Sequence, residues 1–289
     1  MTNETQTVLS FDGVNDWINV PDSTSLRIQD YTVEVWIKPE LVPNETWNGI
    51  VGKAGRNYNI WLYYEGCILH RFHNAASTDS GTPDTPHKSV TWKEWNHIAI
   101  SNDGTTAKTY INGEVKAKGP AGGTSIADNT NLCMGRQLDG TYPRDYYKGY
   151  MAEVRIWNRA RSADEIKATM NQRLAGNEPG LVAYWPFDED TGTVATDKTS
   201  NGNNGTIASA IWVQVTDLPL NEKMGEFEVQ TSSETGFEFS NAANAEVTYT
   251  FTPSGKWMPA KAEVGIPECG PEGIKQFPDQ YQKMLKYPN

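Results

Sequence analysis

The sequence has few cysteines and no long apolar run. Its three cysteines form no CxxC or CxxH cluster, so their spacing indicates neither a zinc site nor a dense set of disulfides. No stretch of about 18 apolar residues is present, and we therefore expect no membrane insertion. The first residues are polar and lack the apolar segment of a cleavable signal peptide. A cytoplasmic protein, export by another route and a piece of a longer exported chain all stay open.

Basic residues are also scarce relative to acidic ones. Of the 289 residues, 25 are Lys or Arg and 36 are Asp or Glu, which gives a formal net charge of −11. Nucleic-acid binding depends on neutralising phosphates with Lys and Arg, so this balance argues against nucleic acid as a partner. Hydrophobic residues make up 37% of the chain, with 10 Trp, 13 Tyr and 8 Phe. That content is enough for a substantial core and argues against disorder.

Short alternating segments fill the first two-thirds of the chain. In YTVEVWIKP, residues 31–39, Val33, Val35 and Ile37 share one face, while Trp36 interrupts the polar face and is expected to be covered by another layer. KTYINGEVK is predicted to be a hairpin with Asn112-Gly113 at its tip. In MAEVRIWN the two faces are expected to carry Ala152, Val154 and Ile156 against Glu153, Arg155 and Trp157. Many short strands with Gly and Asn turns predict an all-β sandwich or jelly roll.

One segment has the pattern of a helix. SADEIKATMNQRLAG begins with Ser162 as the N-cap residue and has Glu165 three positions later, which is the capping-box spacing. Gly176 suits the position that ends a helix. The apolar stripe consists of Ile166, Met170 and Leu174. We expect a short helix that packs on the sandwich.

The last quarter of the chain has a different composition. Residues 216–224 are polar and contain a proline, so we predict a linker there between a first domain at 1–215 and a second at 225–289. Few strands are evident in 225–289, and proline and glycine dominate its end. So few strands bury only a marginal core. We expect a small, incomplete β domain.

Several ordered motifs resemble one family. They are LSFDGVNDWINVPDSTSL at 9–26, WNHIAISNDGTTAKTYINGE at 95–114 and YYKGYMAEVRIWNRARSADEI at 146–166. Together they resemble the laminin-G-like, concanavalin A-like jelly-roll domains over about residues 7–214. PGLVAYWPFDEDTGTVATDKTSNGNNGTI, 179–207, is similar to a segment that in many relatives precedes the first motif. The resemblance implies a jelly-roll sandwich with one short helix, on a fold that hosts lectins, adhesion modules and accessory modules of glycosidases.

Residues 225–289 resemble another family, the first half of the PA-I-type galactose-binding lectins. The matching motifs are GPEG at 270–273 and FPDQ at 277–280. Gln280 matches the sugar-contacting glutamine of that family, and Asp279 precedes it. Phe277 replaces the family's histidine, so galactose specificity is not implied. The calcium ligands of that family lie in its second half, which this chain does not contain.

The stretch DKTSNG at 197–202 is rich in oxygen ligands. It is similar to the first half of a D-x-D-x-D-G calcium loop, but Ala208 occupies the position of the bidentate glutamate. Asn and Gly also serve turns that bind no metal, so a turn and a calcium site completed by another loop are both open. Relatives place FDGVND, 11–16, close to this motif. The candidate calcium ligands are Asp12, Asp16, Asp197, Thr199 and Asn201.

Motifs for catalysis are lacking. The E-x-D-x-x-E strand of glucanases on this fold does not occur, nor does G-x-S-x-G, H-E-x-x-H or a P-loop. The four histidines show no ligand spacing. We therefore predict that the protein is not an enzyme.

Aromatic side chains in loops can form platforms for the C–H faces of sugars, with polar groups for the hydroxyls. The candidate glycan-binding residues of the first domain are Trp47, Tyr142, Arg144, Asp145 and Tyr146. We predict a non-catalytic carbohydrate-binding or cell-adhesion module, assisted by calcium, that recognises glycans or glycoproteins outside the cell or at its surface. A protein-interaction or spacer domain and an accessory module of a glycosidase are the alternatives. The oligomeric state cannot be inferred from the sequence.

Overall fold

The computed structural model describes residues 5–41, 47–54, 56–74, 76, 79–136 and 146–220, which lie in one compact unit, Asn3–Met224. The predicted second domain at 225–289 lies outside the described residues. Among the described residues, no helix is long and apolar enough to cross a membrane.

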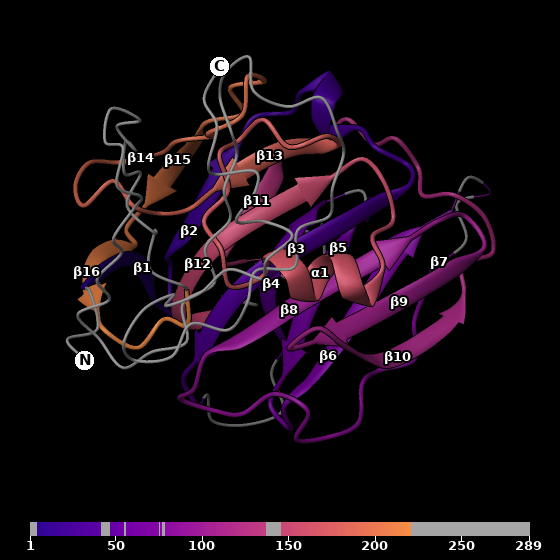
Figure 1. The fold of residues 1–289 in the computed structure, drawn as a ribbon, viewed down its shortest axis with the longest axis horizontal. Coiled ribbons are helices and arrows are strands. Elements are labelled where there is room, and N and C mark those ends of the chain that lie inside the picture. Colours follow the sequence, from indigo (N-terminus) through magenta and orange to yellow (C-terminus); the bar gives the residue numbers. More distant parts are fainter. Residues whose placement is uncertain are drawn as a thin grey trace, which may run out of the picture. The chain divides into compact units, whose positions relative to one another are not determined.

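Two antiparallel sheets, each with eight described strands, form a sandwich (Figure 1). The first sheet has the order β10 (Glu114–Pro120), β9 (Thr106–Ile111), β8 (Asn96–Asn102), β3 (Tyr31–Pro39), β12 (Lys148–Trp157), β1 (Gln6–Asp12) and β16 (Ile211–Val215), with β13 (Leu181–Trp185) also paired to β12. The second has the order β14 (Val194–Ala195), β15 (Gly205–Ala208), β2 (Trp17–Val20), β11 (Leu132–Met134), β4 (Trp47–Lys53), β5 (Asn59–Tyr63), β6 (Cys67–His73) and β7 (Asp79–Gly81). A short 3-10 helix, Thr24–Leu26, follows β2. The predicted all-β jelly-roll sandwich is confirmed.

The core lies between the sheets and follows the alternation of the strands. Val33, Val35 and Ile37 are fully buried in it, as predicted from their spacing. The hairpin tip is confirmed as well, because Asn112 and Gly113 have φ values of 52° and 74°, as a type I′ turn requires. The inner face of β3 is thus readable from the sequence.

In strand β12 the predicted alternation fails at one residue. Glu153 has a φ of 56°, and the pairing with β3 shifts between Ala152 and Arg155, which marks a bulge. Val154 and Ile156 lie in the core as predicted, but Ala152 lies on the outer face, in a cluster with Trp36. The prediction that Ala152 shares the face of Val154 is therefore wrong, because the extra residue reverses the alternation.

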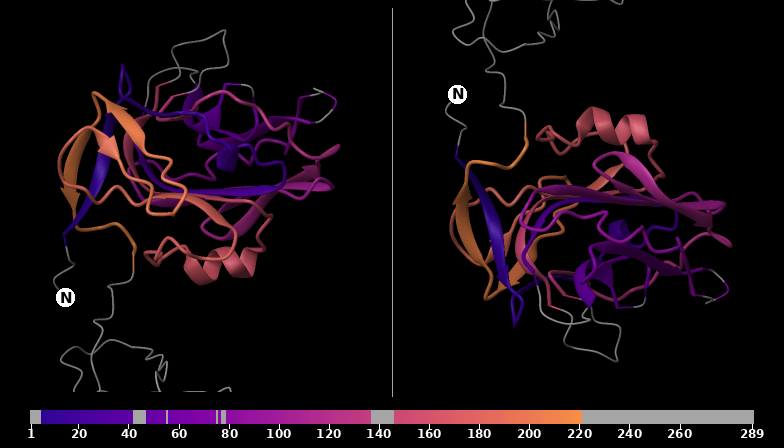
Figure 2. Two further views of the ribbon diagram at one scale, coloured as in Figure 1. Left: turned by 90° about the horizontal axis from the view of Figure 1, so that it is seen from above. Right: turned by 90° about the horizontal axis from the view of Figure 1, so that it is seen from below.

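Helix α1, Ala163–Thr169, lies on the outer side of the first sheet (Figure 2). The capping box is confirmed, since Ser162 and Glu165 bond each other's backbone N–H groups. The helix ends earlier than predicted, however, so Leu174 and Gly176 lie beyond it. Buried side chains bind the carbonyls after its last turn. Trp36 Nε1 donates to the Met170 oxygen over 2.7 Å, and Arg155 Nη1 donates to the Thr169 oxygen over 2.9 Å.

The start of the predicted linker packs against the sandwich. Leu218 is buried in the cluster that contains Trp36. Lys38 forms an ion pair with Asp217, and Trp95 Nε1 donates to the same carboxylate over 3.1 Å. The remainder of the predicted linker, 221–224, lies outside the described residues.

Candidate functional site

The outer face of the second sheet carries a group of aromatic rings around one arginine. In β2 and β5 the apolar residues Ile18, Ile60 and Leu62 lie in the core, so their neighbours in the alternation point outward. We define the aromatic face as Trp17, Trp47, Trp61, Tyr63, Tyr64, Arg136 and Tyr146. All are half-buried except Trp61, which is buried.

At one part of this face, Arg136 is held between two rings. Its guanidinium carbon lies 4.3 Å from the ring centroid of Trp17 and 5.3 Å from that of Tyr146. Its Nη1 atom also donates to the Tyr146 hydroxyl over 3.1 Å. Stacking of this kind is a cation–π contact, and it fixes a side chain that is flexible elsewhere.

At the other part, three rings pack together. The centroids of Trp47 and Tyr63 are 4.4 Å apart at an interplanar angle of 32°, across the pairing of β4 with β5. Tyr63 and Tyr64 have the same centroid separation at 70°. The three rings therefore form one aromatic cluster.

The two parts are joined by the sheet itself. Gly135 N donates to the Ile50 oxygen, so the end of β11 pairs with the middle of β4. Trp17 is thus separated from β4 by two strand spacings, roughly 10 Å. Gly49 pairs with Trp61 and contributes no side chain between the two parts. This spacing suits an extended ligand that touches both.

Two predicted glycan-binding residues lie on the aromatic face, Trp47 and Tyr146. The other six lie outside the described residues and stay predictions: Tyr142, Arg144, Asp145, Phe277, Asp279 and Gln280. Trp17 and Arg136 were not singled out from the sequence. For Arg136 the one local signal is its position after Gly135 at the end of an apolar strand, and this pattern indicates a turn, not a binding site.

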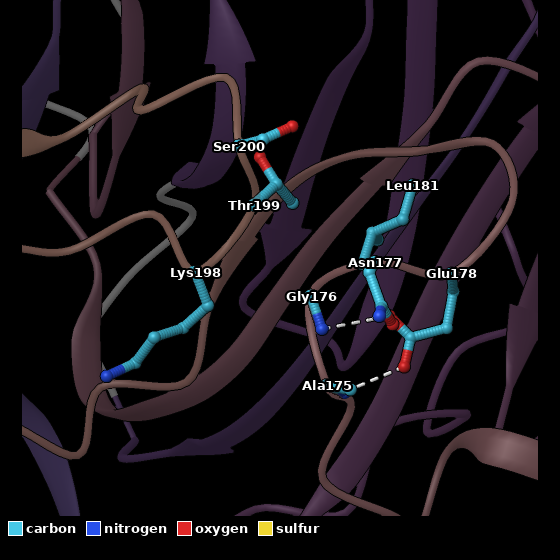
Figure 3. A pocket seen from close by; sticks show the side chains of 8 residues that line it. All are labelled: Ala175, Gly176, Asn177, Glu178, Leu181, Lys198, Thr199 and Ser200. Atoms are coloured by element: carbon cyan, nitrogen blue, oxygen red, sulfur yellow. Dashed lines mark hydrogen bonds between the residues drawn. The ribbon is translucent and has the colours of Figure 1, made fainter.

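A separate hollow of about 510 Å³ lies beside β13, lined by residues 175–178, Leu181 and residues 198–200 (Figure 3). Its carboxylate, Glu178, already accepts the N–H groups of Ala175 and Gly176 over 2.7 and 3.0 Å. Its ammonium group, Lys198, lies 3.3 Å from Asp188. The carboxylate of Glu178 and the ammonium group of Lys198 thus already have partners within the protein. No aromatic ring lines the hollow.

Asp197, from the predicted calcium loop, is the centre of a hydrogen-bonded turn. Its two carboxylate oxygens accept five hydrogen bonds of 2.8–3.0 Å from Tyr184, Thr199 and Asn203. The side chain of Asn201 donates instead to the Val182 oxygen over 2.9 Å. The loop is therefore tied to β13 by its own polar groups.

The other two predicted calcium ligands lie elsewhere. Asp16 Oδ2 accepts the N–H of Asp12 over 2.8 Å, and the adjacent Asn15 contacts Ser209, at the end of β15. Asn203 precedes the start of the same strand. The residues of the loop at 197–201 thus precede β15, whereas Asn15 lies at its other end, and a calcium ion held by all five predicted ligands stays a prediction. In the part of the chain that the structure describes, no group of three or more His, Cys, Asp or Glu is placed to hold a metal ion.

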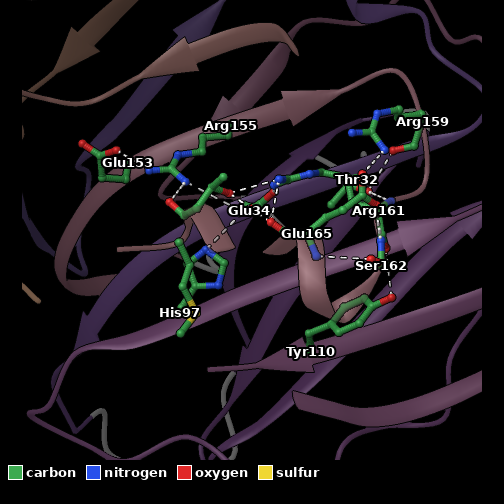
Figure 4. A network of polar contacts seen from close by, with 12 residues as sticks. Thr32, Glu34, His97, Tyr110, Glu153, Arg155, Arg159, Arg161, Ser162 and Glu165 are labelled. Atoms are coloured by element: carbon green, nitrogen blue, oxygen red, sulfur yellow. Dashed lines mark hydrogen bonds and ion pairs between the residues drawn. The ribbon is translucent and has the colours of Figure 1, made fainter. Parts of the chain in front are cut away.

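A cluster of charged residues is buried beneath α1 (Figure 4). Glu34 pairs with Arg161, and His97 Nε2 lies 3.4 Å from Glu34 Oε2. Arg155 Nη2 lies 2.7 Å from Glu153. All five side chains are at most 4% exposed. A substrate cannot reach these carboxylates, so the cluster is structural.

Electrostatics within the cluster set the charge of its acid and its imidazole. Burial alone would raise the pKa of Glu34, but the close contact with His97 and the charges of Arg155 and Arg161 outweigh it and hold the pKa at about 2. Burial lowers the pKa of His97 below its usual value, more than the nearby glutamate raises it. At neutral pH the glutamate is ionised and the histidine is neutral.

Comparisons with known proteins found several similar chains. Human pappalysin-1 is 31% identical over 85 residues, which are 29% of this chain and 5% of that protein. A proposed carbohydrate-binding protein from Bacteroides ovatus, known from its crystal structure, superposes with a TM-score of 0.60 at 22% identity, over 75% of this chain and 62% of that one. Domain 4 of the arabinanase AbnA from Geobacillus stearothermophilus, solved with arabinotriose, gives a TM-score of 0.43 at 24% identity, over 56% and 75% of the two chains. The model of the concanavalin A-like lectin/glucanases superfamily matches residues 12–167, more than half of the chain, and the chain therefore belongs to that family.

Proposed function

We propose that the protein binds carbohydrate through the aromatic face and does not cleave it. The observation that carries this proposal is the pair of half-buried ring groups, around Trp17 and around Trp47, on one sheet surface. Flat rings stack on the C–H faces of sugars, and a few fixed polar groups then orient the hydroxyls. Arg136 and the tyrosine hydroxyls are such groups.

The family and one neighbour support the class of ligand. The superfamily takes its name from lectins and glucanases, and the Bacteroides ovatus protein is described as binding carbohydrate. Glycosidases place two reachable carboxyl groups across the scissile bond. Glu34 and Glu153 are near one arginine but are fully buried. A binding module is thus better supported than a glucanase, and its action on displayed glycans would be extracellular or at a cell surface.

A glycan array tests the proposal. The wild-type chain and Trp47→Ala are applied to the same array, with Trp95→Ala as a matched control, because Trp95 is a half-buried tryptophan in a different cluster, with Trp36 and Leu218. We expect wild type and Trp95→Ala to bind the same glycans and Trp47→Ala to lose signal. If wild type binds no glycan on the array, with or without calcium, a protein-interaction or spacer domain becomes the better account.

A further inference from the structure

Arg136 carries a charge that the described protein does not neutralise. Its side chain contacts are the rings of Trp17 and Tyr146 and the tyrosine hydroxyl, and among the described residues no carboxylate forms an ion pair with it. Its Nε atom is shielded from solvent and has no hydrogen-bond partner. In a chain with a net charge of −11, an arginine without an acidic partner is unexpected.

Arg71, an arginine on strand β6 of the same sheet, shows the contrast. Its Nη1 atom donates to the Thr82 oxygen, and its Nη2 atom lies 3.5 Å from Asp84 Oδ1. The charge of Arg71 is therefore paired with an acidic group of the protein. Arg27 likewise pairs with Asp22. Burying a charge costs free energy unless a partner compensates it, and aromatic rings supply only part of that compensation. Arg136 therefore has donors and charge left over for a ligand.

The geometry points to the missing partner. We propose that the glycan bound by the aromatic face carries a carboxylate, as uronic and sialic acids do, and that Arg136 binds it through paired N–H donors. This inference rests on the proposed function, since it names the class of sugar for the same face. A guanidinium fork matches two carboxylate oxygens, and the rings of Trp17 and Tyr146 hold it in place before the ligand arrives.

A densely charged polyanion fits less well than a single acid group. The aromatic face as defined contains one arginine, Arg136, which has no acidic partner among the described residues, and the whole chain is acidic. Long-range repulsion would therefore oppose a sulfated polymer, while a single carboxylate per site meets one opposite charge at short range.

Matched ligands test the inference without any variant. An array carries glucuronate, galacturonate and sialic acid glycans beside the same glycans after chemical reduction of each carboxyl group to an alcohol. We expect binding to at least one acidic glycan and about tenfold or weaker binding to its reduced counterpart. Equal binding to both members of every pair, or binding to neutral glycans alone, would overturn the carboxylate and leave carbohydrate binding intact. Binding to no glycan at all would overturn both.

Variants then assign the effect to the residue. Arg136→Gln removes the charge, Arg136→Lys keeps the charge without the fork, and Arg27→Gln removes a charge that is already paired. For the acidic glycan we expect about tenfold weaker binding in Arg136→Gln, a partial loss in Arg136→Lys and none in Arg27→Gln. For the reduced glycan we expect a smaller loss in Arg136→Gln than for the acidic glycan, because no carboxylate contact is there to lose, and wild-type binding in Arg27→Gln. Equal loss on both ligands in a folded Arg136→Gln would contradict the role of the guanidinium.

Discussion

Glu34 and Arg161 form an ion pair beneath α1, although 127 residues separate them in the chain. Glu34 is fully buried and Arg161 is 4% exposed, so water screens neither charge. The pair joins the start of the helical segment to the middle of β3. It lies beside the apolar contacts of Ile166 with Ala99 and Tyr110, which also attach the helix to the sheet.

Removal of one partner of this pair should destabilise the fold strongly. Arg161→Met leaves Glu34 buried without its closest cation, and we expect a loss of about 3–5 kcal/mol in the free energy of unfolding, measured by urea titration. Lys116→Met, which breaks an exposed pair with Glu114, is the control and should leave the midpoint unchanged. A loss in Arg161→Met no larger than in the control would show that the buried pair does not hold the helix.

Acid should weaken the same cluster in two stages. The pKa of His97 is lowered in the folded protein. Its contribution to the free energy of unfolding is therefore complete above pH 6.5 and is lost as the pH falls below that value. Glu34, with a pKa of about 2 against an ordinary 4.5, adds a second loss as the pH falls from 4.5 toward 2. We expect the urea midpoint to drop below pH 6.5 and to drop more steeply below pH 4.5.

The control for this pH dependence is His87, whose side chain is 63% exposed. His87→Gln should reproduce the wild-type profile, while His97→Gln should lack the first stage. A midpoint that rises between pH 7 and pH 5 in the wild type would contradict a neutral, buried His97.

Calcium should not act through the loop at 197–203. Both oxygens of Asp197 are occupied by N–H and O–H donors, so Asp197→Ala should cost about 3 kcal/mol of stability in the absence of any metal. The thermal midpoint of the wild type should then be equal in EDTA and in millimolar calcium. A rise in calcium that disappears in Asp197→Ala would revive the metal site.

Gly135 is required next to the arginine. Its φ is 81°, and a Cβ atom there would lie 2.5 Å from the ring of Phe11. Gly135→Ala should therefore cost about 1–3 kcal/mol more than Gly202→Ala. Gly202 also has a positive φ, of 64°, but no described heavy atom lies within 4 Å of its added Cβ. Equal unfolding free energies for the two variants would mean that the packing around Gly135 is not tight.

The sequence predicts local features well because they depend on neighbours in the chain. The faces of β3, the Asn112-Gly113 turn and the capping box at Ser162 each follow from residues a few positions apart. Glu153 shows the limit, since a bulge depends on pairing with β3 and not on the alternation of β12 itself. The helix likewise ends at Thr169, where Trp36, from a distant strand, donates to the carbonyl of the C-cap residue Met170, a contact that the local sequence does not indicate.

The candidate site was predictable only in part for the same reason. Trp47 and Tyr146 could be selected as loop aromatics, whereas the partners that make them a face come from other strands. Trp17 has no distinguishing sequence signal, and Arg136 gains its role only because β2 and β11 are neighbours in the sheet. The sequence alone carries no signal for that pairing.

A calorimetric titration shows whether the sugar binds at the aromatic face. The strongest glycan from the array is titrated calorimetrically into wild type, Trp17→Ala, Trp47→Ala and the control Trp95→Ala, each first checked for folding by its thermal midpoint. We expect about tenfold weaker binding in both variants of the aromatic face, because loss of a stacked ring costs on the order of 1 kcal/mol or more, and wild-type affinity in Trp95→Ala. Unchanged affinity in folded Trp17→Ala and Trp47→Ala would contradict the account, since the sugar would then bind elsewhere.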